Sequence, residues 1–152
     1  MRQTTRIAGK RVTITTNAKT GKTTVKPAKP LEEHLQAAIV RRLKSLPEYG
    51  PRFILAGDMN AARRSPKAQA TATATGIAAG DPDMRIYLQT GRLRLIELKV
   101  GKSPLTASQR DRHPALWALG HDVTVLRADS EGDAADQAEK LVLRWVSEVS
   151  AN

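Results

Sequence analysis

The stretch GDPDMRIYLQTGRLRLIELK, residues 80–99, contains two apolar-rich runs separated by a short polar segment. Residues 84–88 alternate between apolar and polar side chains and predict a strand, and residues 93–100 predict the strand that returns. Between them, the segment 89–91 ends in Gly91, which takes a positive φ without strain and suits a three-residue hairpin loop. We therefore expect an antiparallel hairpin in which Leu88 pairs with Arg92.

This register decides which polar side chains meet. It sets Asp83 opposite Glu97, with Cβ atoms roughly 5 Å apart, and it puts Lys99 on the same face as Glu97 because alternate residues of a strand share a face. Two carboxylates so close repel each other, so the pairing favours a bound cation. Hard oxygen ligands suit Mg²⁺, which usually keeps water and phosphate in its shell. A lysine beside it can orient an attacking water molecule or offset charge in a transition state.

The segment 31–46 predicts an amphipathic helix, with Pro30 at its start, Pro47 beyond its end, and apolar residues at helical spacing between them. These apolar residues are Leu31, Leu35, Ile39, Leu43 and Leu46. At about 100° per residue, Glu32 falls inside the apolar stripe, whereas Glu33 falls on the other side of the helix. A carboxylate inside the stripe is costly unless it is paired or binds metal. We therefore expect Glu32 in the site, although the helix dipole also favours an acid in the first turn.

Two segments between this helix and the hairpin have no strong pattern of their own. Residues 53–56 predict a short strand, followed by a turn at 57–60. Residues 61–80 are rich in Ala, Thr, Arg and Lys with little periodicity, so they predict a long loop with at most a helical turn.

The last third of the chain predicts a helix, a strand and a helix. Thr106-x-x-Gln109 has the form of a capping box that begins a helix, which Pro114 is expected to kink or break and which Gly120 is expected to cap. Residues 123–126 predict a strand. Residues 133–149 predict a helix with these residues facing inward: Ala138, Leu141, Val142 and Trp145. The order of elements predicts an α/β fold.

Positive charge is concentrated at the N-terminus. The chain has Lys+Arg 25 against Asp+Glu 15, a net charge of +10, and residues 1–30 contain eight basic residues and no acidic one. Such an arm favours polyanions, because binding releases counterions from phosphates, although a solubilising tail is the alternative. Val12, Ile14, Thr24 and Val25 could form a small hairpin within it, or the arm could be disordered without DNA. We expect two parts: a basic N-terminal arm or small hairpin at 1–30, and a single domain at 31–152.

Composition excludes several other classes of protein. The chain has no cysteine, so disulfides and thiolate metal sites are excluded. Aromatic residues make up only 3% of the chain, which argues against modules that stack single-stranded bases. No apolar run approaches the roughly 20 residues of a membrane span, and the N-terminus lacks the apolar stretch of a signal peptide. We therefore expect an intracellular protein without a membrane partner.

The motifs Gly80-Asp-Pro-Asp83, Ile96-Glu-Leu-Lys99 and Gln109, in this order, resemble the PD-(D/E)XK nuclease superfamily and, more narrowly, its VRR-NUC family. Members of that family have a G-x-P-D turn, an E-[LV]-K strand, a Gln at the head of a later helix, and an early helix with a Glu before an apolar-Gln pair. Glu32 with Leu35-Gln36 matches that helix. The resemblance covers roughly residues 31–128, including LGHDVTV at 119–125 as the following strand.

The resemblance implies a restriction-endonuclease-like core, in which a mixed central β-sheet is flanked by helices. Carried over by position, it implies metal ligands at Asp83, Glu97 and the Leu98 carbonyl oxygen, a catalytic lysine at Lys99, and supporting catalytic residues at Glu32 and Gln109. Two features lie outside the family's pattern. Asp81 adds an acid beside the turn, and the basic arm 1–30 is not covered.

Further polar residues have two readings each. Gln109 either caps its helix or donates a hydrogen bond to a ligand water or a phosphate. His113 and His121 lack a catalytic partner at a readable spacing, so we expect structural or phosphate-contacting roles. The basic residues that we expect to contact DNA are Arg41, Arg63, Arg64, Lys67 and Lys102, with His34 and Arg42 as further candidates. A solvated charged surface is the alternative for all of these basic residues.

Short members of the family resemble dimeric, structure-specific enzymes that act on branched DNA, often from phages or bacteria. We therefore predict a Mg²⁺-dependent endodeoxyribonuclease, with Mn²⁺ able to substitute, that forms a homodimer and cuts branched DNA such as four-way junctions. The alternatives are a non-catalytic basic DNA-binding protein, a flap or nicking nuclease without junction preference, and a basic RNA-associated assembly factor.

Overall fold

The computed structural model describes residues 1–58 and 65–151. The chain divides into two compact units, Met1–Pro30 and Leu31–Asn152, and each has its own β-sheet. None of the helices in the described part of the chain is long and apolar enough to cross a membrane.

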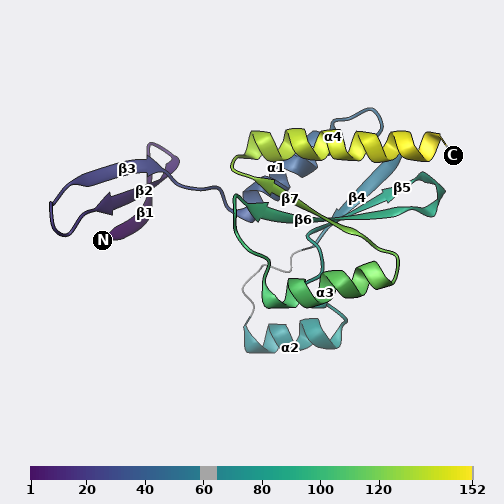
Figure 1. The fold of residues 1–152 in the computed structure, drawn as a ribbon, viewed down its shortest axis with the longest axis horizontal. Coiled ribbons are helices and arrows are strands. Elements are labelled where there is room, and N and C mark those ends of the chain that lie inside the picture. The colour runs from purple at the N-terminus through teal and green to yellow at the C-terminus, as the bar shows by residue number, and fades with distance from the viewer. Residues whose placement is uncertain (59–64, 152) are drawn as a thin grey trace. The chain divides into compact units, whose positions relative to one another are not determined.

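The N-terminal unit is a three-stranded antiparallel sheet in the order β1-β2-β3 (Figure 1). Its strands are β1 (Arg2–Ile7), β2 (Lys10–Thr16) and β3 (Thr23–Pro27). The sequence predicted only the β2–β3 hairpin, because the polar run of β1 has no alternating apolar pattern. β1 instead follows from the turn at Ala8-Gly9, where φ values of 47° and 78° fit the positive-φ turns that join two antiparallel strands.

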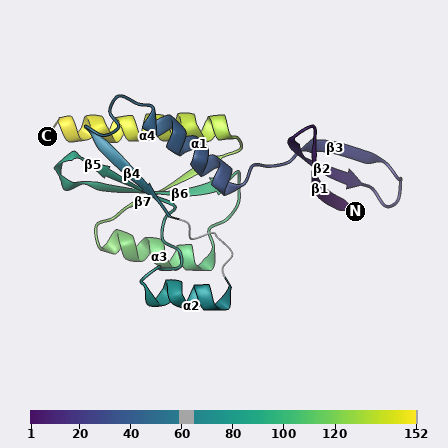
Figure 2. The ribbon, with the colours of Figure 1, turned by 180° about the vertical axis from the view of Figure 1, so that it is seen from behind.

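The second unit contains a four-stranded mixed sheet in the order β4-β5-β6-β7. Its strands are β4 (Phe53–Gly57), β5 (Met84–Leu88), β6 (Leu93–Val100) and β7 (Val123–Ala128), and a short turn, η1 (Gln89–Gly91), joins β5 to β6. The pairs β4–β5 and β5–β6 are antiparallel, and β6–β7 is parallel. Helices lie on both sides of this sheet, so the predicted α/β fold with a mixed central sheet is confirmed (Figures 1 and 2).

Two helices form the core side of the sheet. The helices α1 (Glu32–Lys44) and α4 (Glu131–Ser150) pack on each other and on the same sheet face. Leu35, Ile39 and Val142 of these helices meet Ile96 and Leu98 of β6, and all five side chains have no exposed surface. Burying each such side chain contributes about 1.5–3 kcal/mol, so this layer fixes which face of β6 points inward.

The other side of the sheet carries α3 (Ala107–Ala118), with α2 (Pro66–Ala74) beyond it in both views. The predicted long loop at 61–80 is therefore wrong for its middle part, which is helical, and its first residues up to 64 lie outside the described residues. The side chain of Ser65 caps α2, and Pro66 occupies its first turn. Ala72 is its only buried residue, which explains why no apolar period marks this helix.

A break at Pro114 is wrong, because α3 runs through it without interruption, whereas the alternative, a kink, stays a prediction. Proline lacks the N–H that would bond the Arg110 carbonyl oxygen. Arg110 is exposed, and α3 has no fully buried residue, so water can hydrate that oxygen at little cost. The capping box is confirmed: Thr106 Oγ1 accepts from Gln109 N, and Gln109 Oε1 accepts from Thr106 N.

Other boundaries shift by a few residues. The first helix spans Glu32–Lys44 rather than 31–46, β7 extends to Ala128, and α4 begins at Glu131. Of the residues predicted to face inward from α4, Leu141 is only partly buried.

Gly80 fixes the turn that leads into β5. Its φ is +83°, and a Cβ atom added there would lie 2.4 Å from the Ser108 carbonyl oxygen at the start of α3. The turn 80–83 therefore packs directly on α3, and only glycine permits both the backbone angle and the close approach.

We predict that Gly80→Ala lowers the free energy of unfolding by more than Gly76→Ala does. Gly76 has a similar φ of +88° but nothing within 4 Å of an added Cβ, so its loss should be only the backbone strain of about 1–2 kcal/mol. Gly80→Ala adds a clash with backbone to the same strain. Urea denaturation of both variants measures the difference, and equal losses would contradict the close packing of the turn on α3.

Candidate active site

β6 carries two buried charged side chains on the face opposite to Ile96 and Leu98, which point into the core. Glu97 (0% exposed) and Lys99 (4% exposed) share that opposite face with Leu95. These are the two buried charged residues in the described part of the chain. Burying charge is expensive unless partners compensate it, so the neighbours of Glu97 and Lys99 define the candidate site.

The β5–β6 register brings Asp83 to Glu97. Met84 pairs with Ile96, and Leu88 N donates to Arg92 O at 2.8 Å, which agrees with the predicted hairpin. One step beyond Met84, Asp83 stands opposite Glu97. Its Oδ2 accepts a hydrogen bond of 2.7 Å from the main-chain N–H of Leu98. The backbone of β6 therefore holds the Asp83 carboxylate against the same strand that carries Glu97.

The start of α1 adds a second carboxylate to Lys99. Lys99 Nζ lies 3.0 Å from Glu97 Oε1 and 3.2 Å from Glu32 Oε1. The adjacent Glu33 points elsewhere, with its side chain 74% exposed. One turn along the helix, Gln36 Nε2 donates to the Asp83 carbonyl oxygen at 3.3 Å. The helix thus reaches the site at two points, one on Lys99 and one on the turn before β5.

The start of α3 closes the site from the other side. The capping role of Gln109 is confirmed, because its Oε1 completes the capping box, and its Nε2 donates to Glu97 Oε1. The hydrogen bond from Gln109 to a ligand water or a phosphate stays a prediction. One turn later, His113 Nε2 lies 3.6 Å from Glu97 Oε2, and its side chain is 11% exposed. Sequence reasoning did not place His113 here, because the contact depends on how α3 packs on the sheet.

Burial and charge shift the ionisation of these groups. Burial raises the pKa of the Asp83 carboxyl group to about 7, although the hydrogen bond from Leu98 opposes the rise. Burial also raises the pKa of Glu97, and Lys99 offsets part of that rise. Burial would lower the pKa of Lys99, but Glu97 and Glu32 outweigh it and raise the pKa. Nearby positive charge therefore compensates the carboxyl groups of Asp83 and Glu97 only in part.

In the part of the chain that the structure describes, two buried side-chain atoms have no hydrogen-bond partner: Glu97 Oε2 and His113 Nε2. They face each other, but burial and then the charge of Lys99 lower the pKa of His113, so a charged pair is disfavoured. An unpartnered carboxylate oxygen beside a second carboxylate fits a hard cation. Among residues 1–58 and 65–151, no three His, Cys, Asp or Glu side chains come together as a metal-binding group. A metal here would therefore rest on two carboxylates completed by main-chain oxygen, water and substrate.

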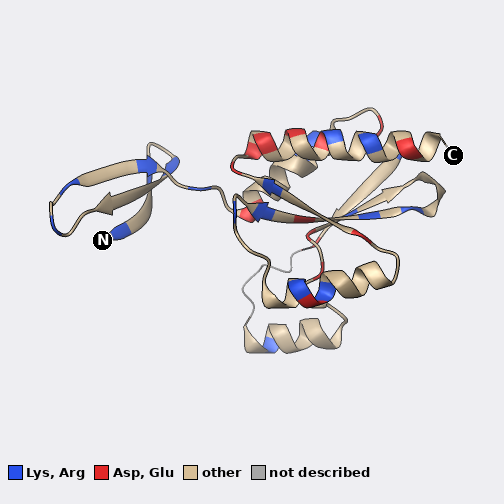
Figure 3. Cartoon of the chain, in the orientation of Figure 1, with Lys and Arg blue, Asp and Glu red and all other residues tan. Residues whose placement is uncertain are grey.

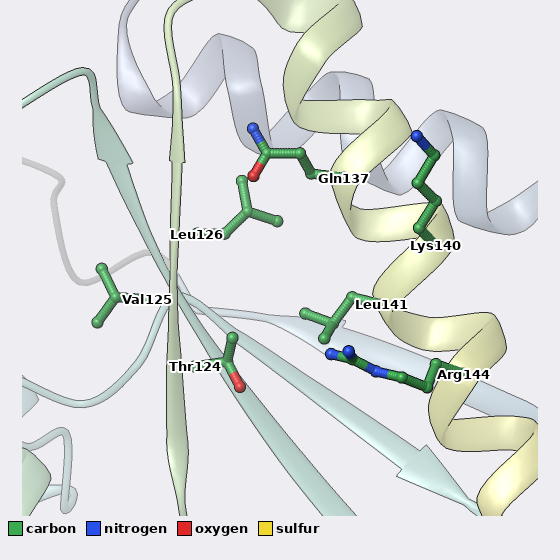
Figure 4. Close-up of a pocket in the computed structure, with 7 residues that line it drawn as sticks. All are labelled: Thr124, Val125, Leu126, Gln137, Lys140, Leu141 and Arg144. Carbon is green, nitrogen blue, oxygen red and sulfur yellow. The ribbon is translucent and has the colours of Figure 1, made fainter.

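A cavity of about 250 Å³ opens beside these residues. Its lining includes Glu32, Asp83, Lys99 and Gln109, and Gln69 of α2 borders it. Figure 4 shows another hollow, of about 310 Å³, between β7 and α4. The lining of that hollow includes Lys140 and Arg144 but no carboxylate, so it does not share the chemistry of the first cavity.

Asp81 serves a different purpose from Asp83. Its carboxylate pairs with Arg85 at 3.1 Å and with Arg112 at 2.6 Å, and Arg85 also pairs with Asp58 at 3.2 Å. This network ties the turn to β5 and α3. The acid that the sequence left ambiguous is thus engaged by arginines, whereas Asp83 is the one beside Glu97.

The basic residues expected to contact DNA are dispersed. Arg41 is 68% exposed and lies 3.5 Å from Glu131, Lys67 is exposed on α2, and Lys102 is exposed just after β6. Arg42 pairs with Asp136 and Glu139, so its charge is already compensated. Arg63 and Arg64 lie outside the described residues. His121, beyond the end of α3, is exposed and does not line the cavity.

Comparison with known proteins adds to this geometry. No protein-family model and no curated protein matches the sequence significantly. Among solved structures, a protein described as "VRR_NUC domain protein" matches with a TM-score of 0.50 and 22% sequence identity, over 72% of this chain and 88% of that one. At this identity the likeness establishes the fold, and it agrees with the family resemblance of the motifs. Over the matched part, this chain therefore has the same fold as that VRR_NUC domain protein.

Proposed function

We propose that this chain is a metal-dependent nuclease that hydrolyses phosphodiester bonds in DNA. The observation that carries the proposal is the convergence of Asp83, Glu97 and Lys99. Asp83 and Lys99 line one cavity, and Glu97 lies against Lys99 with its Oε2 buried and without a hydrogen-bond partner. Like charges held close together with little exposure lower the stability of a fold. Carboxyl groups with shifted pKa values beside a lysine are typical of catalytic sites. The VRR-NUC fold supports the same conclusion.

In this proposal Asp83 and Glu97, with the Leu98 carbonyl oxygen as the resemblance implies, hold Mg²⁺ or Mn²⁺. The ion, when bound, polarises the phosphate and lowers the pKa of a bound water molecule. Gln109 donates to Glu97 Oε1 and so leaves Oε2 free to face the ion. The Leu98 N–H fixes Asp83 through Oδ2. The protein's task is to hold both carboxylates in place before substrate arrives.

Lys99 is positioned to act as a cation rather than as a base. Its raised pKa keeps it protonated at neutral pH, and Glu97 and Glu32 hold its ammonium group from two sides. A fixed ammonium group at the cavity can orient the attacking water molecule and offset negative charge that develops on the phosphate. Glu32 then acts as a positioning residue for Lys99.

The substrate within this proposal is branched DNA, such as a four-way junction, and the assembly is a homodimer. Arg41, Lys67 and Lys102, with Arg63 and Arg64, would contact the phosphate backbone. The apolar side chains of Trp117 (70% exposed) and Leu119 (76% exposed) at the end of α3 support a contact between two copies.

One observation favours a second candidate, a DNA-binding protein without catalysis. Lys99 already pairs with two carboxylates, so the cluster could be a closed structural ion network. The two candidates differ in whether metal is needed and whether DNA is cut.

We predict that Glu97→Gln abolishes metal-dependent cutting. Wild type should cut labelled four-way-junction DNA with Mg²⁺ or Mn²⁺ and not with EDTA. Both Glu97→Gln and Lys99→Ala should cut at least about a hundredfold more slowly, because each loses a group that acts on the transition state. Lys99→Ala should still bind DNA.

The matched control is Glu33→Gln, which changes one exposed carboxylate on α1 and should cut like wild type. Flapped and linear DNA in the same assay separate a junction enzyme from a flap or nicking nuclease. Tight binding without cutting under any metal would support the second candidate, and cutting by Glu97→Gln at the wild-type rate would show that the proposed site is wrong.

We predict that Asp83→Asn is at least as stable as wild type in EDTA at pH 8. The raised pKa means that ionised Asp83 destabilises the fold, and this cost grows as pH rises from the acid's ordinary value to about 7. An amide avoids the charge while still accepting from Leu98.

Added Mg²⁺ should then stabilise only the wild type. At about 100 times its Kd the ion would add about 2.7 kcal/mol to the free energy of unfolding. Thermal unfolding with and without Mg²⁺ measures both effects, with the exposed Asp111→Asn as the control that should behave like wild type. A large loss of stability in Asp83→Asn would point to a structural acid.

We predict that the protein sediments with twice the mass of one chain at micromolar concentration. Trp117→Ala combined with Leu119→Ser should shift it toward the monomer, since both side chains are exposed on the single chain. Analytical ultracentrifugation is the measurement. A monomeric mass for wild type would contradict paired cutting of a junction and leave a flap or nicking nuclease.

A further inference from the structure

The strand register of the N-terminal sheet sorts its side chains onto two faces. Cross-strand partners share a face, and alternate residues along a strand do too. Arg2 pairs with Thr15, Thr4 with Thr13, and Arg6 with Arg11. On the other side of β2, Thr13 pairs with Lys26 and Thr15 with Thr24. One face therefore carries four cations, Arg2, Arg6, Arg11 and Lys26, interleaved with four threonines.

We call this surface the cationic face. The 3.5 Å contact between Thr4 Oγ1 and Thr13 Oγ1 agrees with the placement of their side chains on one side. The opposite face carries the apolar residues of the unit: Ile7, Val12, Ile14 and Val25. A sheet that gathers its apolar residues on one face and its arginines on the other has two different surfaces.

The charge on the cationic face has no acidic partner within the unit. Residues 1–30 contain no Asp or Glu, and all the charged residues that Figure 3 marks on these strands are Lys or Arg. Arg6 donates to the Gly9 carbonyl oxygen at 3.4 Å and Arg11 to the Lys29 carbonyl oxygen at 3.2 Å. These bonds orient the guanidinium groups but leave their charge uncompensated.

The chemistry of this face fits phosphate rather than bases. Residues 1–30 contain no Phe, Tyr or Trp, so the unit has no platform on which unpaired bases could stack. Arginine and lysine bind phosphate oxygens, and threonine hydroxyls between them can donate to the same oxygens. Contacts of this kind position a duplex without reading its sequence.

We propose that the cationic face of the N-terminal sheet binds the phosphate backbone of double-stranded DNA. The inference rests on the proposed function in one respect, namely that the duplex is an arm of the DNA that the catalytic unit cuts. It assigns this binding to Arg2, Arg6 and Lys26 on one face rather than to the net charge of residues 1–30.

Two triple variants of the full chain test this assignment. Arg2→Gln with Arg6→Gln and Lys26→Gln removes three charges from the cationic face. Lys10→Gln with Lys19→Gln and Lys22→Gln removes three charges from the opposite face and from the β2–β3 turn. Arg11 is left unchanged because it bonds Lys29. Circular dichroism checks that both variants keep the strand signal, and Arg2→Lys with Arg6→Lys keeps the charge as a further control.

Affinity for a linear duplex is measured in EDTA, so that no cutting occurs, at several salt concentrations. The cationic-face variant should bind about tenfold or more weakly, and the slope of log K against log salt should fall in magnitude by about 2 to 3. The opposite-face variant should change by no more than about twofold. Equal weakening of both triple variants would overturn the assignment to one face, as would wild-type affinity in the cationic-face variant. Equal loss for single-stranded DNA or anionic lipid vesicles would overturn the choice of duplex.

Cutting assays separate this inference from the proposed function. At saturating DNA, the cationic-face variant should keep the wild-type kcat with Mg²⁺ and raise only KM. If the full chain binds DNA through this face but never cuts it, the nuclease proposal is wrong and the binding site stands. If Glu97→Gln abolishes cutting but the cationic-face variant binds with wild-type affinity, the nuclease proposal stands and the binding site is wrong.

Discussion

The buried pair Glu97 and Lys99 sets the constraint that the rest of the unit Leu31–Asn152 meets. Their strand must be central to hold the core, so the face that does not point into the core places both charges where little water reaches them. Burying two ions costs several kcal/mol each before partners compensate them. Three neighbouring segments contact this pair or its strand: Glu32 of α1 pairs with Lys99, Gln109 of α3 donates to Glu97, and Asp83 before β5 accepts from the Leu98 N–H.

In the described part of the chain, two neighbouring buried side-chain atoms lack a hydrogen bond, and we expect the chemistry beside them. Lys99 is held by two carboxylates and Glu97 Oε1 accepts from Gln109, but Glu97 Oε2 and His113 Nε2 have no hydrogen-bond partner. A protein selected only for stability would not keep a buried carboxylate oxygen unsatisfied. The close approach of Gly80 to Ser108 packs the turn before β5 against the start of α3, the helix that carries Gln109 and His113.

The chain also places its cluster of carboxylates and its cluster of uncompensated cations in two different units. The acids of the candidate site lie beside a cavity in the unit Leu31–Asn152, and the cations of the cationic face lie on the N-terminal unit. Carboxylates repel DNA, so under the proposed function positive charge elsewhere would bring the phosphate backbone near. The proposed role of the cationic face meets this need without placing further charge among the carboxylates.

Local rules were enough to predict the hairpin 84–100, its register and hence the meeting of Asp83 with Glu97, because loop length alone determines which residues pair. The capping box at Thr106 and the choice of Glu32 over Glu33 followed from equally local spacing. The sequence did not predict the helix 66–74 or the strand β1, since neither has an apolar period. It predicted a helix after Thr106, but without an apolar period it did not predict that this helix continues through Pro114. Only the tertiary structure brought His113 and Gln109 to Glu97 and Gln36 to Asp83. Those contacts join residues from separate elements, and their distances depend on how the helices pack on the sheet rather than on any spacing along the chain.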